Sequence, residues 1–113
     1  MKLPGLRRAV VPRRKVVGYL LSPTHPEGRG KAAFFRRFGF SAEAWDVLAG
    51  ALRRHAAEHE VAREEPSPFG TRYVVEGIME TPSGRTPRGR PVWFIDEEDG
   101  VPRLVTAYPL HPR

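Results

Sequence analysis

The sequence predicts an α+β fold, in which two or three N-terminal helices pack on one face of a three- to four-stranded antiparallel sheet. Apolar residues recur at helical spacing through the first 60 positions, whereas later runs are rich in β-branched and aromatic residues and are separated by turn signals. The length of 113 residues suits a single domain. We expect a helical half at about 12–60 and a β-meander at about 72–109.

The first helix is predicted to begin at Pro12, because the fixed φ of proline suits the first helical position. The apolar residues of PRRKVVGYLL then follow helical spacing. Three cations fill the first turn, where the helix dipole disfavours them unless an anion binds. Pro23 and Pro26 end this helix, since the residue before a proline avoids helical conformation.

Two more helices are expected before residue 60. A short one covers KAAFFRRF and ends at Gly39, a natural residue just after a helix. The next covers about 42–60, with Ser41 as its cap and an amphipathic stripe through Trp45, Leu48 and Leu52. The stretch EEPSPFG is predicted to be a linker into the second half.

The second half reads as three strands: RYVVEGIME, PVWFIDEE and VPRLVTAYP. The pair Asp99-Gly100 is typical of a tight turn between the last two strands. Residues 6–11 offer a fourth strand.

Composition narrows the class of protein. The chain has no cysteine, which excludes disulfides and thiolate metal sites. It contains neither the apolar core of a signal peptide nor an apolar run of the ~20 residues that a membrane span needs. We therefore expect a cytoplasmic protein that does not bind membranes.

The sequence also lacks Asn and Gln, and 16 of its 19 basic residues are Arg. Proteins from hot environments avoid thermolabile amides, although a GC-rich genome would also favour Arg and Pro. An unfolding midpoint above the ~45–65 °C of mesophile domains would favour the thermophilic interpretation.

The net charge of +6 is concentrated in the N-terminal third, where residues 1–37 carry ten Lys and Arg and one acidic residue. Such asymmetry is typical of proteins that bind polyanions, because fixed cations release phosphate counterions. An Arg-rich surface that only aids solubility is the other interpretation. The candidate RNA contacts in this third are Arg13, Arg14, Lys15, Arg29, Arg36 and Arg37.

Three short motifs suggest chemistry that we do not expect here. His55, Glu58 and His59 match the H-x-x-E-H string of zinc peptidases, but a third ligand on a second helix is missing, so structural histidines are the better interpretation. GRGK at 28–31 lacks the remainder of a phosphate loop and retains only a general affinity for anions. The four consecutive acids at 96–99 fit a solvated turn.

The stretch YLLSPTHPEGRGKAAFFRRFGFSAEAW, followed late in the chain by VPRLVTAYP, resembles a small prokaryotic domain family of unknown function. The resemblance covers roughly residues 4–109. Members of that family often neighbour another small gene, an arrangement similar to toxin–antitoxin pairs. The resemblance therefore implies a small acidic partner protein encoded nearby.

A looser resemblance is to the barnase–EndoU–colicin–RelE class of metal-independent ribonucleases, which place helices before an antiparallel sheet with catalytic residues on its open face. It implies that His25 acts as general base or acid and Lys31 as the cation that stabilises the transition state. Thr106 and Tyr108 alternate along the last strand, hence share one face, and would hold the phosphate. Arg72 is a weaker addition as an RNA contact.

The implied reaction is transfer of phosphate to the RNA 2′-OH, which needs no metal or other cofactor. The alternative is a non-catalytic module that binds an acidic protein partner or nucleic acid. In that case His25 and Lys31 only stabilise the 22–31 loop. The two hypotheses differ in space, because an enzyme needs His25, Lys31 and the Thr106/Tyr108 face in one cleft.

Overall fold

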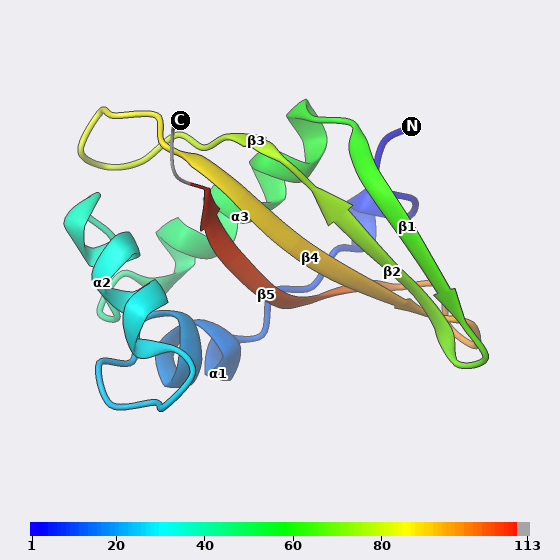
Figure 1. Ribbon diagram of the computed structural model, residues 1–113, viewed down its shortest axis with the longest axis horizontal. Helices are drawn as coiled ribbons and strands as arrows, with labels where there is room; N and C mark the ends of the chain where they lie inside the picture. The colour runs from blue at the N-terminus through cyan, green and yellow to red at the C-terminus, as the bar shows by residue number, and fades with distance from the viewer. Residues whose placement is uncertain (111–113) are drawn as a thin grey trace.

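The computed structural model of the protein describes residues 1–110 and confirms the α+β class, with helices before strands in the chain (Figure 1). The last three residues of the expected domain lie outside the described part. The helical segments are the 3₁₀ turn η1 (Leu6–Arg8), α1 (Arg13–Lys15), the π-helical η2 (Val16–Leu20), α2 (Arg29–Arg37) and α3 (Trp45–Glu58). The strands are β1 (Val61–Ser67), β2 (Gly70–Val75), β3 (Gly77–Ile78), β4 (Arg88–Asp96) and β5 (Pro102–Leu110).

The strands form one antiparallel sheet with β4 at its centre. Strands β2 and β3 pair with β4 along one side, β5 pairs along the other side, and β1 pairs with the outer edge of β2. The meander predicted from the sequence therefore corresponds to β2–β3, β4 and β5.

Strand β1 corrects the prediction of a linker. Residues 61–67 form an edge strand that returns into β2 through a tight turn, in which the Ser67 hydroxyl donates a hydrogen bond of 2.9 Å to the Gly70 carbonyl. Charged residues and a proline hide this strand from sequence analysis, yet both are typical of edge strands, which they protect from pairing with other chains.

The strand expected at residues 6–11 is also corrected. This segment begins as the η1 turn and then pairs with the sheet only through one parallel bridge, between Val10 and Arg103. Val11 is nevertheless buried, because it packs between the sheet and the helices.

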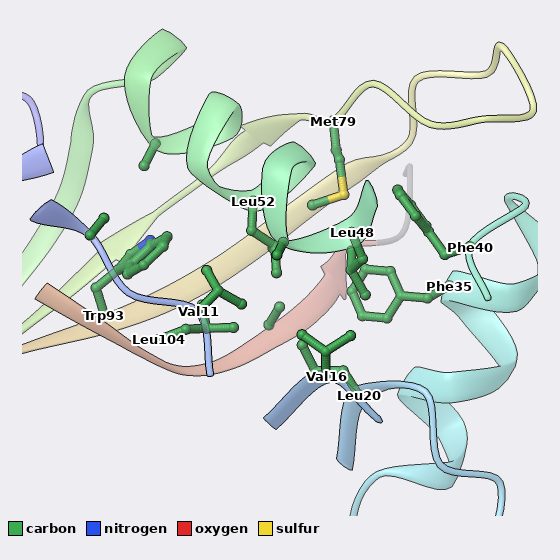
Figure 2. Packing of buried hydrophobic residues seen from close by; sticks show 14 of the residues in the cluster. Val11, Val16, Leu20, Phe35, Phe40, Leu48, Leu52, Met79, Trp93 and Leu104 are labelled. Atoms are coloured by element: carbon green, nitrogen blue, oxygen red, sulfur yellow. The ribbon is translucent and has the colours of Figure 1, made fainter. Parts of the chain in front are cut away.

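The core lies between one face of the sheet and the helices. Leu48 and Leu52 of α3 face Trp93 and Leu104 of the sheet, and Phe35 of α2 joins them at one end (Figure 2). The opposite face of the sheet has no helix across it (Figure 1). Among the described residues, no helix is long and apolar enough to cross a bilayer.

A β-bulge decides which side chains of β5 reach the open face. Thr106 pairs with Val92 and Leu104 pairs with Trp93, so Val105 is an extra residue without a partner on β4. Such a bulge changes the alternation of the strand. Leu104 consequently faces the core, whereas Thr106 and Tyr108 lie on the open side.

Candidate functional site

Tyr19 lies at the centre of the residues that the sequence singled out. Its hydroxyl shares a hydrogen bond of 2.9 Å with the Oγ1 of Thr106, across a separation of 87 residues in the chain. The ring of His25 packs edge-on against the Tyr19 ring, with 4.9 Å between centroids. The Nζ atoms of Lys31 and Lys15 lie 5.3 and 5.4 Å from the Tyr19 ring centroid.

The π-helical register of η2 places Tyr19 there. The N–H of Leu21 donates to the carbonyl of Val16, five residues earlier, at 2.8 Å. This wide turn lets Val16, Leu20 and Leu21 all enter the core, where each is fully buried. Tyr19 is thereby left facing β5. Single π-helical turns of this kind are frequent at functional sites.

The loop that follows is folded into consecutive turns that present His25. The carbonyl of His25 accepts hydrogen bonds from the N–H groups of Gly28 and Arg29, at 3.1 and 3.0 Å. Gly28 lies directly against η2, since a Cβ atom there would stand 2.4 Å from the Tyr19 carbonyl oxygen. Only glycine therefore lets the loop approach Tyr19 this closely.

The hydrogen bonds of His25 define its resting tautomer. Its Nδ1 accepts a hydrogen bond of 3.1 Å from the Glu27 N–H, so the neutral ring carries its proton on Nε2. In this state Nε2 is a hydrogen-bond donor, suited to an anionic oxygen. His25 gains a free lone pair at Nε2 only when the bond from Glu27 is released and the proton moves to Nδ1.

Lys31 lies between the two tyrosines. Its ammonium donates to the Glu27 carbonyl at 3.2 Å and stands 4.8 Å from the centroid of the Tyr108 ring. Tyr108 is 40% exposed, so one cation is held beside an accessible aromatic ring.

These residues surround an open groove of about 510 Å³. Three of the four candidate catalytic residues, His25, Thr106 and Tyr108, line it, and Lys31 stands at its edge above the tyrosine rings. The sequence-predicted residues are thus brought together, on the side of β5 that faces away from the core.

The candidate RNA contacts are divided by the structure. Arg14, Lys15 and Arg72 line the groove, and Arg37 lines a second groove beside it. Arg36 instead donates through Nε and Nη2 to the Leu21 carbonyl, at 3.2 and 2.8 Å, and so supports the fold. Arg13 and Arg29 are exposed and line neither groove.

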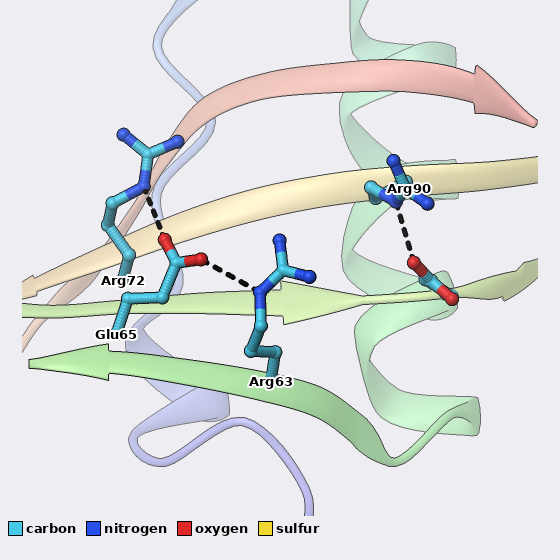
Figure 3. Close-up of polar contacts among 5 residues, drawn as sticks. Arg63, Glu65, Arg72 and Arg90 are labelled. Atoms are coloured by element: carbon cyan, nitrogen blue, oxygen red, sulfur yellow. Dashed lines mark hydrogen bonds and ion pairs between the residues drawn. The ribbon is translucent and has the colours of Figure 1, made fainter.

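Beyond the groove, the open face of the sheet carries further charged side chains, and these form ion pairs. Glu65 pairs with Arg63 at 2.8 Å and with Arg72 at 3.4 Å, and Arg90 pairs with Glu76 at 2.6 Å (Figure 3). Arg90 is the cross-strand neighbour of Tyr108.

The cations nearest to Tyr19 are not paired with a carboxylate in the described residues, although Glu27 lines the same groove. Within residues 1–110, Arg14, Lys15 and Lys31 make no ion pair. Unpaired cations around an open groove favour an anionic ligand.

The histidines of the H-x-x-E-H string lie elsewhere and are bonded to the fold. The Nε2 atoms of His55 and His59 bond to the carbonyls of Gly77 and Ile78 at 3.1 and 2.8 Å, and so join α3 to β3. Burial lowers the pKa of His55 from 6.5 to about 4. Another groove, of about 650 Å³, lies between α3 and the β3–β4 loop, and no histidine of residues 1–110 lines it.

Tyr19 is the central residue that sequence reasoning missed. Its position within an apolar helical stretch gives no signal, because only the π-helical turn directs it toward β5.

The comparison with family models matches a domain of unknown function, DUF6883, over residues 2–111. The chain belongs to the DUF6883 family. This confirms the resemblance to a family of unknown function that the two sequence stretches indicated. A comparison of this DUF6883 chain with curated proteins finds no match.

A solved structure shares the fold of this DUF6883 chain. It belongs to a contact-dependent growth inhibition toxin–immunity protein complex from Klebsiella pneumoniae 342, with a TM-score of 0.74 and 16% sequence identity. The match covers 96% of this chain and 98% of the other. At this identity the likeness is one of fold alone, and it is a fold found in a toxin–immunity complex.

Proposed function

We propose that this protein is a toxin-like, metal-independent ribonuclease whose active site is the groove around Tyr19. The observation that carries the proposal is the convergence of His25, Thr106 and Tyr108 on one groove with Lys31 at its edge. A non-catalytic module has no need to bring these side chains together. The fold shared with a chain of a toxin–immunity complex adds support.

The proposed reaction is attack of an RNA 2′ oxygen on the adjacent phosphorus. The 2′-O–P bond forms, the P–O5′ bond breaks, the 2′ proton is removed by His25, and solvent water delivers a proton to the departing 5′ oxygen. The products are a 2′,3′-cyclic phosphate and a 5′-hydroxyl. Proton transfer by a positioned side chain contributes roughly 100- to 10,000-fold to such reactions.

Each side chain has a role that fits its position. Lys31 and Lys15 supply positive charge for the phosphorane, where extra negative charge develops. The resting His25 donates from Nε2 to a phosphate oxygen, and it accepts the 2′ proton once its bond from Glu27 is released. The hydroxyls of Tyr19 and Thr106 hold each other in place beside the phosphate.

The proposal includes an acidic protein partner. The unpaired cations of Arg14, Lys15 and Lys31 attract carboxylates as well as phosphates, so an immunity-like protein that covers the groove would block RNA. The structural relative belongs to a complex of a toxin with an immunity protein.

The test is incubation of the purified protein with mixed RNA, with and without EDTA. We expect cleavage in both samples, cyclic phosphate ends, and no cleavage where a 2′-deoxy nucleotide replaces the attacking ribose. Lys31→Ala should reduce cleavage strongly, whereas the matched Lys2→Ala should not, because Lys2 lies far from the groove beside Glu60. Intact RNA in every sample would refute the nuclease and leave the non-catalytic module.

A further inference from the structure

A second groove, of about 500 Å³, adjoins the first on the α2 side of Tyr108. Residues 30, 33, 34 and 37 share one face of α2, by helical spacing, and all of them line this groove. The side chains of Ala32 and Phe35 point instead into the core. The volume lies within the range of small-ligand sites.

The walls of the second groove are largely apolar, although Glu27, Lys31 and Arg37 also line it. Phe34 packs against the rings of Phe35 and Phe38, at centroid distances of 5.3 and 5.0 Å. Pro109 and Tyr108 form the wall on the β5 side. An apolar slot that includes aromatic side chains suits the flat face of a nucleobase, and stacking of this kind is indifferent to base identity.

Tyr108 and Glu27 line both grooves. The Lys31 ammonium, which lines the second groove, stands over the rings of Tyr108 and Tyr19. Arg37 lines the second groove and makes no ion pair within residues 1–110. A phosphate beside Lys31 would therefore leave its adjoining base next to the apolar walls.

We propose that the second groove binds the nucleobase that adjoins the scissile phosphate of single-stranded RNA. The inference rests on the proposed ribonuclease function and adds the class of substrate. A base enters such a slot only when it is unpaired and unstacked, so double-stranded RNA is excluded.

The probe is a DNA oligonucleotide that contains one ribonucleotide and hence a single scissile linkage. An abasic site placed on one side of that linkage should raise KM by roughly 5- to 150-fold, the range of one lost base stack, whereas one on the other side should not. Blunt-ended duplex containing the same linkage should resist cleavage.

A substitution in the protein itself can fill the same groove. Ala33 is exposed on α2, so Ala33→Leu leaves the core intact and places a bulky group among the walls. We expect KM to rise for the intact oligonucleotide and to change little for the abasic one, with the two effects not additive. Ala57→Leu, at an exposed position on α3, is the matched control and should leave KM unchanged.

The outcomes separate this inference from the function on which it rests. Normal cleavage with no effect of abasic sites or of Ala33→Leu overturns the base site and leaves the nuclease. Failure of the wild-type protein to cleave the ribonucleotide linkage overturns both proposals.

Discussion

Two regions of this molecule hold a histidine packed against another ring, and they differ in almost every other respect. At the α3–β3 contact, His55 is 1% exposed and its ring lies 4.5 Å from that of His59, and both rings bond to strand carbonyls. At the groove, His25 lies beside Tyr19, near Arg14, Lys15 and Lys31, which make no ion pair within residues 1–110. Whether a histidine is structural or a candidate for chemistry is thus indicated by its surroundings in the fold more than by its sequence motif.

The largest expected effect comes from His25→Ala. Cleavage of RNA should fall roughly 100- to 10,000-fold, because a group that transfers or stabilises charge is lost. The unfolding midpoint should remain nearly unchanged, since the ring lies in a loop outside the core.

The matched control is His59→Ala, which removes a histidine outside the groove and should keep cleavage. Retained cleavage in His25→Ala, together with a stability loss of roughly 1–3 kcal/mol, would make His25 a structural residue of the loop. The comparison between the two regions would then fail.

The second prediction concerns pH. The folded pKa of His55, about 4, lies below its ordinary value of 6.5, because burial disfavours the charged ring. Between these values the unfolded chain binds a proton that the folded chain does not. Stability should therefore fall as the pH drops from about 6.5 toward 4, by on the order of 3 kcal/mol.

Denaturant unfolding measured along this pH series, for the wild type and for His55→Gln, isolates the effect. The glutamine amide retains a donor for the Gly77 carbonyl but does not titrate. An equally steep loss of stability in the variant would assign the acid sensitivity to the carboxylates.

The third prediction compares two glycines. Gly28→Ala should cost roughly 1–3 kcal/mol of unfolding free energy, because its Cβ would overlap the Tyr19 carbonyl and push the loop away. Cleavage should fall with it as His25 moves. Gly50→Ala, on the open surface of α3, should instead gain roughly 0.5–1 kcal/mol from helix propensity. If Gly28→Ala lowered the unfolding free energy no more than Gly50→Ala does, the loop would tolerate displacement from Tyr19.

The smallest expected effect is that of Tyr19→Phe, about 1 kcal/mol of stability, the usual contribution of one hydrogen bond. Thr106 is only 4% exposed, and its hydroxyl would lose its hydrogen-bond partner. The double variant Tyr19→Phe/Thr106→Val should lose less unfolding free energy than the two single variants lose in sum. A double-mutant cycle would measure this difference. Strict additivity would mean that the hydrogen bond between Tyr19 and Thr106 contributes nothing to stability.

The fold class was predictable because its signals are local. The helical stripe through Leu48 and Leu52 and the apolar strands each reflect a period that one segment carries by itself. Strand β1 was missed for a physical reason: an edge strand exposes both faces, so charged residues and Pro66 leave it no apolar alternation to detect.

The candidate site was predictable in its residue types but not in its geometry. Alternation places Thr106 and Tyr108 on one face, but the bulge at Val105, which no local pattern reveals, decides that this is the open face. Tyr19 escaped notice because its direction depends on one wide helical turn. Both features arise from packing against distant segments.

The bond between Tyr19 and Thr106 joins an early and a late part of the chain. During synthesis, the helices and the His25 loop leave the ribosome first, and β5 follows all the other strands. Since residues emerge at about 5–20 per second, the nascent protein spends several seconds with only half of the groove. Contacts of such long sequence separation are also slow to form. A cell that makes this protein would therefore have an interval between the first folded helices and the first complete site, and a partner protein that recognises β5 could act only at its end.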